Sequence, residues 1–200
     1  MSAMLLHNSA VSGNCYKVRL LAAHLAIPLE LHELDVVDRS NRPAVIGQLN
    51  PALRVPTMVL DDGRPLAESN AIIDYLAEGT EYLPDDRYER AQALAWQFFE
   101  QYEIEPNLAV ARFLKLFDVE APEAFWRERF DAGRKGLDAL ERGLTGKTWL
   151  VGERYSVADI SLYAYTHVAH EGGFDLEPYP QIRAWLQRVA AQPGHIAIDA

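Results

Sequence analysis

The stretch ALRVPTMVLDDGRPLAESNAIIDYL, residues 52–76, decides the fold of this chain. Residues 57–60 are β-prone, and the turn that follows contains Gly63, which suits the positive φ of a tight hairpin. Residues 65–67 can then pair back as a second strand. From Glu68 onward the apolar residues fall at helical spacing, which predicts a helix directly after the hairpin. A helix start presents unpaired N–H groups and a positive dipole end, so this one is a candidate site for a ligand carboxylate.

The segment before the hairpin predicts a β-α-β unit. Residues 4–7 are a short strand candidate, and the apolar spacing from Cys15 predicts a helix that ends before Pro28. Residues 29–37 alternate as a second strand, and a looser helical stretch at 42–50 leads to the hairpin. The order βαβ-α-ββα is typical of a small mixed sheet with helices on its faces.

The pattern changes after the helix that follows the hairpin. Residues 80–87 predict a linker, and beyond it strand patterns nearly vanish. The long helical pattern at 90–117 contains Pro106, where we expect a bend. We therefore expect an α/β domain at residues 1–79 and an all-helical domain at 88–200, sizes that are typical of small domains.

Composition excludes several classes of function. The formal net charge is −10 and the pI is near 5.0, which argues against nucleic acid because phosphate binding needs clustered Lys and Arg. No apolar run approaches the roughly 20 residues of a membrane helix, and the N-terminus has no signal-peptide pattern. A single cysteine, Cys15, excludes an internal disulfide, and the histidines show no metal-ligand spacing. We expect a cytoplasmic protein without a metal ion.

A polar loop at residues 9–15 lies between the first predicted strand and helix. Ser12 and Asn14 are hydrogen-bond donors just ahead of the helix, where an anion or a thiolate would be stabilised. The same residue types are preferred helix caps, and taken alone the pattern favours capping over catalysis. The helix dipole could lower the pKa of the Cys15 thiol, although a cysteine that starts an amphipathic helix more often packs in the core.

Two further groups stand on either side of the hairpin. The Val55–Pro56 bond lies where cis bonds occur, and a cis bond would leave the backbone of Val55 to an extended, peptide-like ligand. A trans proline that starts a strand has the higher base rate. Glu68 and Ser69 pair a carboxylate with a hydroxyl, which suits the ammonium and carboxylate of an α-amino acid head group. Charge complementarity at a helix start is the simpler alternative.

Three of these segments resemble stretches of the cytosolic glutathione S-transferases, and nearly the whole chain takes part. Residues 50–57, NPALRVPT, are similar to the family's N-P-x-x-x-V-P-T stretch, which contains a cis proline. Residues 68–72, ESNAI, are similar to its E-S-x-A-I stretch, and residues 156–161, SVADIS, match a capping box in its helical domain. The resemblance implies a thioredoxin-like N-terminal domain followed by an all-helical C-terminal domain.

The resemblance also implies that glutathione is the co-substrate and where it binds. Val55, beside Pro56, would pair through its backbone with the cysteinyl part of glutathione. Glu68 and Ser69 would hold the γ-glutamyl end, and Arg54 would reach the glycine carboxylate.

Residues 12–19, SGNCYKVR, resemble the serine-type active-site turn of several classes of the family, including bacterial members. This likeness implies that Ser12 donates a hydrogen bond to the thiolate and that Asn14 does the same, as an asparagine does in some bacterial members. Ser9 is an alternative because this loop is longer than in some relatives. Cys15 is a second alternative, although it is offset from the usual position of a cysteine nucleophile.

We therefore expect a homodimeric glutathione transferase that acts in detoxification and conjugates the thiolate to small hydrophobic electrophiles. Ser12 and Asn14 would lower the pKa of the glutathione thiol by hydrogen bonding. An apolar electrophile pocket between the domains would be lined by Tyr102, Ile104, Leu108 and Phe113. Two alternatives stay open: a glutathione-dependent disulfide or peroxide reductase, with Cys15 as a candidate nucleophile, and a non-catalytic glutathione S-transferase-like binding protein.

Overall fold

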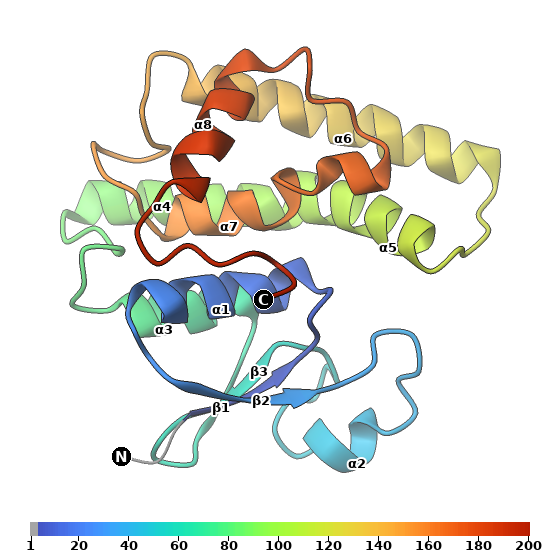
Figure 1. The fold of residues 1–200 in the computed structure, drawn as a ribbon, viewed down its shortest axis with the longest axis vertical. Coiled ribbons are helices and arrows are strands. Elements are labelled where there is room, and N and C mark those ends of the chain that lie inside the picture. Colours follow the sequence, from blue (N-terminus) through green and yellow to red (C-terminus); the bar gives the residue numbers. More distant parts are fainter. Residues whose placement is uncertain (1–3) are drawn as a thin grey trace. The chain divides into compact units, whose positions relative to one another are not determined.

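The computed structural model describes residues 4–200, which form two compact units (Figure 1). One unit comprises the chain up to Glu78 together with Pro193–Ala200, and the other comprises Gly79–Gln192. The sequence predicts a helical domain that continues to residue 200. The structure instead places Pro193–Ala200, hereafter the C-terminal segment, with the first unit.

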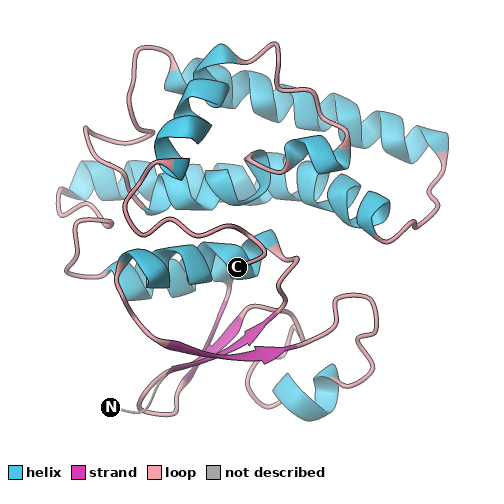
Figure 2. Ribbon diagram, viewed as in Figure 1, coloured by secondary structure: helices cyan, strands magenta, loops and turns pink. Residues whose placement is uncertain are grey.

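The first unit contains a four-stranded sheet with the strand order β2-β1-β3-β4. Its strands are coloured magenta in Figure 2. Its strands are β1 (Met4–Asn8), β2 (Leu29–Glu33), β3 (Thr57–Val59) and β4 (Pro65–Ala67). β1 pairs in parallel with β2 and antiparallel with β3, and β3 and β4 form the predicted hairpin. The mixed sheet that the sequence predicts is confirmed.

Helices cover both faces of this sheet. α1 (Gly13–His24) and α3 (Ser69–Ala77) lie side by side on one face, and α2 (Arg42–Ile46) lies on the other (Figure 1). The core of the unit is formed by apolar side chains with no exposed surface, among them Leu6, Val18, Leu21, Met58, Ile72 and Ile73. Each such side chain stabilises the fold by roughly 1.5–3 kcal/mol relative to an exposed position. The arrangement is the thioredoxin-like fold.

β2 is shorter than its alternating sequence predicts. The alternation suggested a strand over residues 29–37, but the strand ends at Glu33. Just beyond it, the Asp35 carboxylate accepts hydrogen bonds from the backbone N–H groups of Val37 (2.6 Å) and Asp38 (3.1 Å). An aspartate that binds its own downstream backbone forms a turn in competition with a strand, which explains the early end.

The second unit is entirely helical, as expected. Its elements are α4 (Arg87–Phe99), the π-helix η1 (Glu100–Ala109), α5 (Val110–Leu116), α6 (Glu123–Leu144), α7 (Val157–Thr166), the 3₁₀ turn η2 (Ala169–Gly172) and α8 (Pro180–Ala190). α7 is buried along its whole length and packs against α4, η1 and α8. It is therefore the central helix of this unit.

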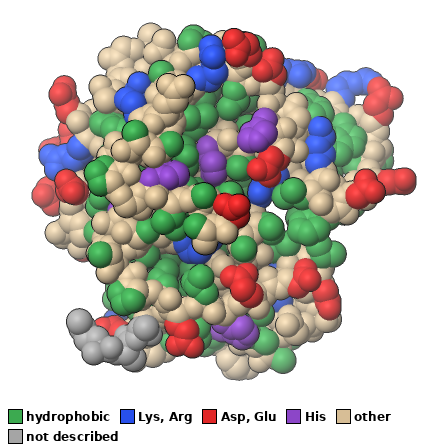
Figure 3. Space-filling view, in the orientation of Figure 1, with side chains coloured by type: hydrophobic (Ala, Val, Ile, Leu, Met, Phe, Trp, Pro, Cys, Tyr) green, Lys and Arg blue, Asp and Glu red, His purple; other side chains and the backbone are tan. Residues whose placement is uncertain are grey.

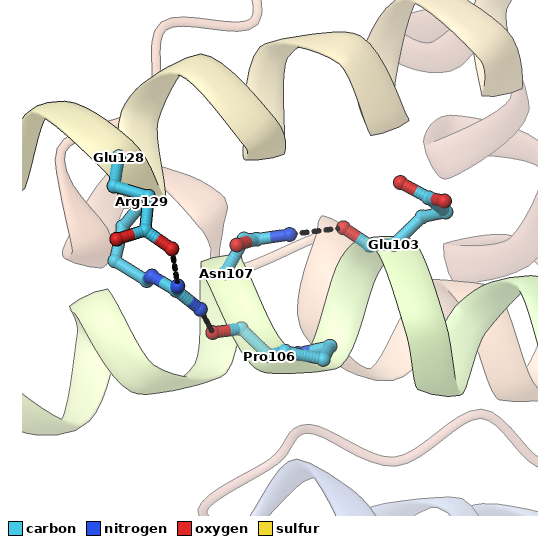
Figure 4. A network of polar contacts seen from close by, with 5 residues as sticks. All are labelled: Glu103, Pro106, Asn107, Glu128 and Arg129. Atoms are coloured by element: carbon cyan, nitrogen blue, oxygen red, sulfur yellow. Dashed lines mark hydrogen bonds and ion pairs between the residues drawn. The ribbon is translucent and has the colours of Figure 1, made fainter.

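The chain passes Pro106 by widening the helix into a π-helix. Proline has no N–H to donate, so regular α-helical bonding cannot continue through it. The side chain of Asn107 donates to the carbonyl of Glu103 (2.7 Å), and Arg129 of α6 donates to the carbonyl of Pro106 (3.2 Å) (Figure 4). Side-chain donors thus add hydrogen bonds to carbonyl groups of this irregular segment.

The predicted capping box at the start of α7 is present. The fully buried Asp159 carboxylate accepts hydrogen bonds from the backbone N–H groups of Ser156 (3.1 Å) and Leu150 (3.1 Å) and from the indole N–H of Trp185 (2.9 Å). Burial raises the pKa of Asp159 to about 6, and these hydrogen bonds oppose the rise. One side chain thus ties the start of α7 to α8 and to the loop that precedes both.

The surface carries charges of both signs. On the face shown in Figure 3, acidic and basic side chains are interspersed and neither gathers into one large patch. Among residues 4–200, the helices are too short or too polar to span a bilayer. The same part of the chain holds no cluster of three His, Cys, Asp or Glu side chains that could bind a metal ion.

Candidate active site in the thioredoxin-like unit

The turn before α1 is organised by Ser12, which caps the helix. Its hydroxyl accepts a hydrogen bond from the backbone N–H of Cys15 (3.3 Å), as expected for an N-cap serine. The capping role is therefore confirmed. Whether Ser12 also donates to a thiolate stays a prediction. Ser9 is buried, and its backbone N–H lies 3.3 Å from the Cys15 sulfur.

Cys15 is enclosed in the core of the unit. Its side chain has no exposed surface, and burial raises the pKa of the thiol to about 11. The hydrogen bonds from Ser12 and Ser9 only partly oppose this rise. A thiol with such a pKa is protonated at neutral pH, and the thiolate is the nucleophilic form. The packing interpretation of this cysteine therefore fits the structure better than a nucleophilic one.

Arg19 of α1 forms hydrogen bonds with the loop before α1 and with the C-terminal segment. Its guanidinium donates to the carbonyl of Ala10 (3.0 Å) and to the carbonyls of Ile198 (2.6 Å) and Ala200 (2.7 Å). Glu33 accepts from the backbone N–H of Ala10 (3.0 Å) on the other side. Neither charged residue is predicted from the sequence to support the loop, because its partners lie between 9 and 181 residues away along the chain.

Asn14 and Ser69 meet at the point where the first turns of α1 and α3 lie together. The Ser69 hydroxyl donates to the amide oxygen of Asn14 (3.2 Å), and the Lys17 ammonium donates to the same oxygen (2.9 Å). Lys17 also lies 3.4 Å from the Ser69 hydroxyl. A residue predicted to act on the thiolate and one predicted to bind the γ-glutamyl end are thus in direct contact. No sequence pattern predicts that Lys17 belongs to this site.

The loop that leads into β3 is braced by two buried polar side chains. The Val55–Pro56 peptide bond in this loop is cis, as the resemblance implied. The carbonyl of Arg54 accepts from the Thr57 hydroxyl (2.8 Å) and from the Asn50 amide (3.1 Å), which also donates to Thr57 (2.9 Å). Both bracing residues belong to the motif NPALRVPT, so the signal for this brace lies within eight residues of the sequence.

This loop and the start of α3 leave polar groups open to a ligand. Within residues 4–200, the backbone N–H and C=O of Val55 form no hydrogen bond. Arg54 and Glu68 are exposed, while Ser69 is buried. Glu68 has a φ of 71°, in the left-handed region that side chains other than glycine rarely adopt. Such a conformation costs on the order of 1–3 kcal/mol and tends to occur at functional sites.

The four side chains predicted to line an electrophile pocket all belong to the helical unit and differ in exposure. Ile104 and Leu108 are fully buried, and each packs closely against a glycine of α6: a Cβ added at Gly136 would lie 3.2 Å from Ile104, and one at Gly133 would lie 3.1 Å from Leu108. Ile104 and Leu108 are thus core residues of this unit. The other two differ from them: Tyr102 is 78% exposed and Phe113 is half-buried.

Comparisons with known proteins agree with this organisation. Residues 11–78 match the model of the glutathione S-transferase N-terminal domain, and residues 93–193 match that of the C-terminal domain. A crystal structure of a glutathione S-transferase from Pseudomonas fluorescens is similar to this chain with a TM-score of 0.93 and 44% identity, covering 98% of this chain and 99% of that one.

Two curated proteins illustrate the range of activities among similar chains. Glutathione S-transferase 2 from Anopheles gambiae is 30% identical, over 92% of this chain and 88% of its own length. The disulfide-bond oxidoreductase YfcG from Escherichia coli is 29% identical, over 92% of this chain and 89% of its own length.

Proposed function

The chain belongs to the glutathione S-transferase family, and from this premise we propose that it conjugates glutathione to small hydrophobic electrophiles. The observation that carries the proposal is the hydrogen bond between Asn14 and Ser69. These residues come from two separate motifs, one proposed to activate the thiol and the other to hold the γ-glutamyl end. Their contact supports a single site for thiol activation and glutathione binding.

Glutathione would bind along the loop and the start of α3. The N–H and C=O of Val55 are suited to pair with the cysteinyl part of the tripeptide, as a short strand does with a sheet edge. Glu68 is suited to the α-ammonium group, and the N-terminus of α3 with Ser69 is suited to the α-carboxylate. The exposed Arg54 is proposed to meet the glycine carboxylate.

Thiol activation would depend on donors at the start of α1. The free thiol is mostly protonated at neutral pH, and hydrogen bonds to the thiolate favour its ionised form. The Ser12 hydroxyl accepts from Cys15, yet a hydroxyl that accepts one bond still has its own proton to donate. The Asn14 amide supplies N–H donors, and the positive end of the α1 dipole adds to the effect. The thiolate would then attack an electrophilic carbon and form a carbon–sulfur bond. With an aryl halide, the carbon–halogen bond breaks and the halide leaves with its electron pair.

A second candidate is glutathione-dependent disulfide reduction, which the likeness to YfcG favours. The same activated thiolate would attack a disulfide sulfur, forming a mixed disulfide with glutathione and releasing the other sulfur as a thiol. This route does not need Cys15, whose burial and raised pKa argue against a direct role. Peroxide reduction and a non-catalytic binding role are further outcomes that the same assays distinguish.

Turnover of a model aryl halide, a model disulfide and a model hydroperoxide, each with glutathione, tests the proposal. We expect Ser12→Ala and Asn14→Ala each to lower the conjugation rate about 10–100-fold and to raise the pKa of the bound thiol, since each removes one donor. Cys15→Ala should leave both quantities nearly unchanged. Loss of disulfide or peroxide reduction in the Cys15→Ala protein would support a reductase that uses Cys15 as its nucleophile. A wild-type protein that does not bind immobilised glutathione would refute the proposal.

A homodimer and a cytoplasmic location complete the proposal. The family resemblance implies the dimer. Leu94 and Phe98 support it, because they lie four residues apart on α4 with 47% and 57% of their surface exposed. Exposed apolar side chains at this spacing form a stripe along a helix that a second copy of the chain could cover.

A further inference from the structure

Lys17 is a fully buried charged residue for which the proposed function gives no role. It lies in the second turn of α1 and has no exposed surface. Lysine is almost never fully buried unless its ammonium group is paired, because removing a charge from water is costly. Its ammonium group is 2.9 Å from the amide oxygen of Asn14 and 3.4 Å from the hydroxyl of Ser69. The buried charge therefore lies against two residues of the proposed site.

The chemistry of lysine fixes which way the Asn14 amide faces. An ammonium group has three N–H donors and no acceptor, so only the oxygen end of the amide can face Lys17. The Ser69 hydroxyl donates to the same oxygen (3.2 Å). With two donors on its oxygen, the amide is held against rotation and its NH₂ group points away from Lys17. Without them, the oxygen and nitrogen ends could exchange places at little cost.

We propose that Lys17 is a positioning residue: by holding the oxygen of the Asn14 amide, it presents the NH₂ group of Asn14 to the glutathione thiolate. The inference rests on the proposed function, because it assumes that Asn14 donates to the thiolate. An inverted amide would turn its oxygen toward the sulfur and repel a thiolate. The lysine charge also polarises the amide, which strengthens its N–H donors. Lys17 thus acts on the thiol through Asn14 without touching glutathione.

The test is the pKa of the thiol of bound glutathione, measured by titrating thiolate absorbance in the complex. In Lys17→Met we expect this pKa to rise by about 1, so that about tenfold less thiolate is present at a pH below the pKa. Lys17→Arg keeps the charge and the N–H donors, and it should restore most of the thiolate. Lys135→Met removes one positive charge from an exposed site on α6 and should leave the pKa unchanged.

A double substitution separates positioning from a direct effect of the charge. In the Asn14→Ala background, Lys17→Met should raise the pKa of the bound thiol no further, since there is no amide left to orient. A full additional increase in that background would overturn the positioning role, and so would an unchanged pKa in Lys17→Met alone. Either result would leave the proposed function intact, provided that the wild-type protein lowers the pKa of bound glutathione. A wild-type protein that fails to do so would refute the proposed function and this inference with it.

The orientation of the amide can also be measured without glutathione. The side-chain NH₂ signal of Asn14 in an isotope-labelled protein is identified by its absence in Asn14→Ala. It should move in Lys17→Met and stay in place in Lys135→Met; an unmoved signal in Lys17→Met would overturn the inference. If Lys17→Met does not fold, Lys17→Gln keeps an N–H donor while removing the charge, and a smaller shift in the same direction is expected.

Discussion

Replacing Asn50 with alanine should destabilise the loop that carries Arg54 and Val55. The Asn50 side chain is 3% exposed and makes three hydrogen bonds within this short segment. Its amide N–H groups donate to the Arg54 carbonyl (3.1 Å) and the Thr57 hydroxyl (2.9 Å), and its oxygen accepts from the backbone N–H of Ala52 (2.9 Å). The Asn50 side chain therefore stabilises the conformation of the loop that leads into β3.

The size of the effect follows from these contacts. A typical hydrogen bond adds about 1 kcal/mol to stability, and a buried group left without its partner costs about 1–3 kcal/mol. The Arg54 carbonyl keeps its second donor, Thr57, which limits the damage. We therefore expect Asn50→Ala to lower the free energy of unfolding by about 2–3 kcal/mol. Because Val55 lies in the same loop, we also expect glutathione to bind about tenfold more weakly, which corresponds to about 1.4 kcal/mol.

Urea denaturation measures the first quantity, and isothermal titration of glutathione measures the second. The matched control is Gln48→Ala, a substitution in the same segment at an exposed position, which should change stability by less than about 0.5 kcal/mol. Equal stability of the Asn50→Ala and Gln48→Ala proteins would refute the bracing role. A destabilised Asn50→Ala protein with unchanged glutathione affinity would show that the loop does not form the binding site.

Three further predictions concern other parts of the chain. Asp159→Asn should lower the free energy of unfolding by about 2–4 kcal/mol, because an NH₂ group would face N–H donors in the core. Since burial raises the pKa of Asp159 to about 6, its ionisation should lower the free energy of unfolding of the wild-type protein as the pH rises from about 4 to 6. Urea denaturation of the Asp159→Asn protein at several pH values should not show this decrease. Burial lowers the pKa of His24 and of His195. On acidification the unfolded chain therefore binds protons at these histidines before the folded chain does, so the free energy of unfolding is highest above about pH 6.5 and falls at lower pH. Hydrogen exchange should accordingly show weaker protection of the C-terminal segment near pH 5.5, and His24→Gln should reduce that change. Phe98→Glu should convert the proposed dimer to a monomer in light scattering, and an unchanged mass would place the interface elsewhere.

Local sequence was sufficient to predict the hairpin and the helix start at Ser69. Residues 57–60, Gly63 and residues 65–67 each express a preference that depends only on near neighbours, and the structure has the predicted β3–β4 hairpin there. The capping box of Ser156 and Asp159 is equally local. Patterns of this kind succeed because the turn, the strand and the cap are all decided within a few residues.

Burial of charge could not be predicted in the same way. Lys17 and Arg19 lie on a helix whose residues are buried on several faces, so helical spacing does not separate an inward side from an outward one. Their partners Ser69 and Ile198 are distant in sequence and become neighbours only in the fold. The C-terminal segment has no periodic pattern to connect it with α1.

Apolar residues of the helical unit had a related ambiguity. Ile104 and Tyr102 both have large hydrophobic side chains, yet Ile104 is fully buried and Tyr102 is exposed. Pro106 predicted a bend, and the structure has a π-helix there. Two side chains, Asn107 and Arg129, donate to carbonyl groups of this segment, and only Asn107 is close in sequence. Core and pocket positions differ in what surrounds them, and hydrophobicity alone does not contain that information.

Ser12 shows why capping and catalysis need not be alternatives. From the sequence, helix capping and thiolate stabilisation are alternatives, because both use the Ser12 hydroxyl. In the structure the Ser12 oxygen accepts a hydrogen bond from the Cys15 N–H, which fixes the position of the side chain. The hydroxyl proton of Ser12 can still be donated to another group. A donor that is already held in place loses little entropy when the thiolate forms, and such preorganisation is what makes electrostatic stabilisation effective. The cap would therefore assist the proposed chemistry, just as Lys17 would assist Asn14: in both residues, one hydrogen bond made to the protein orients another that is offered to the sulfur.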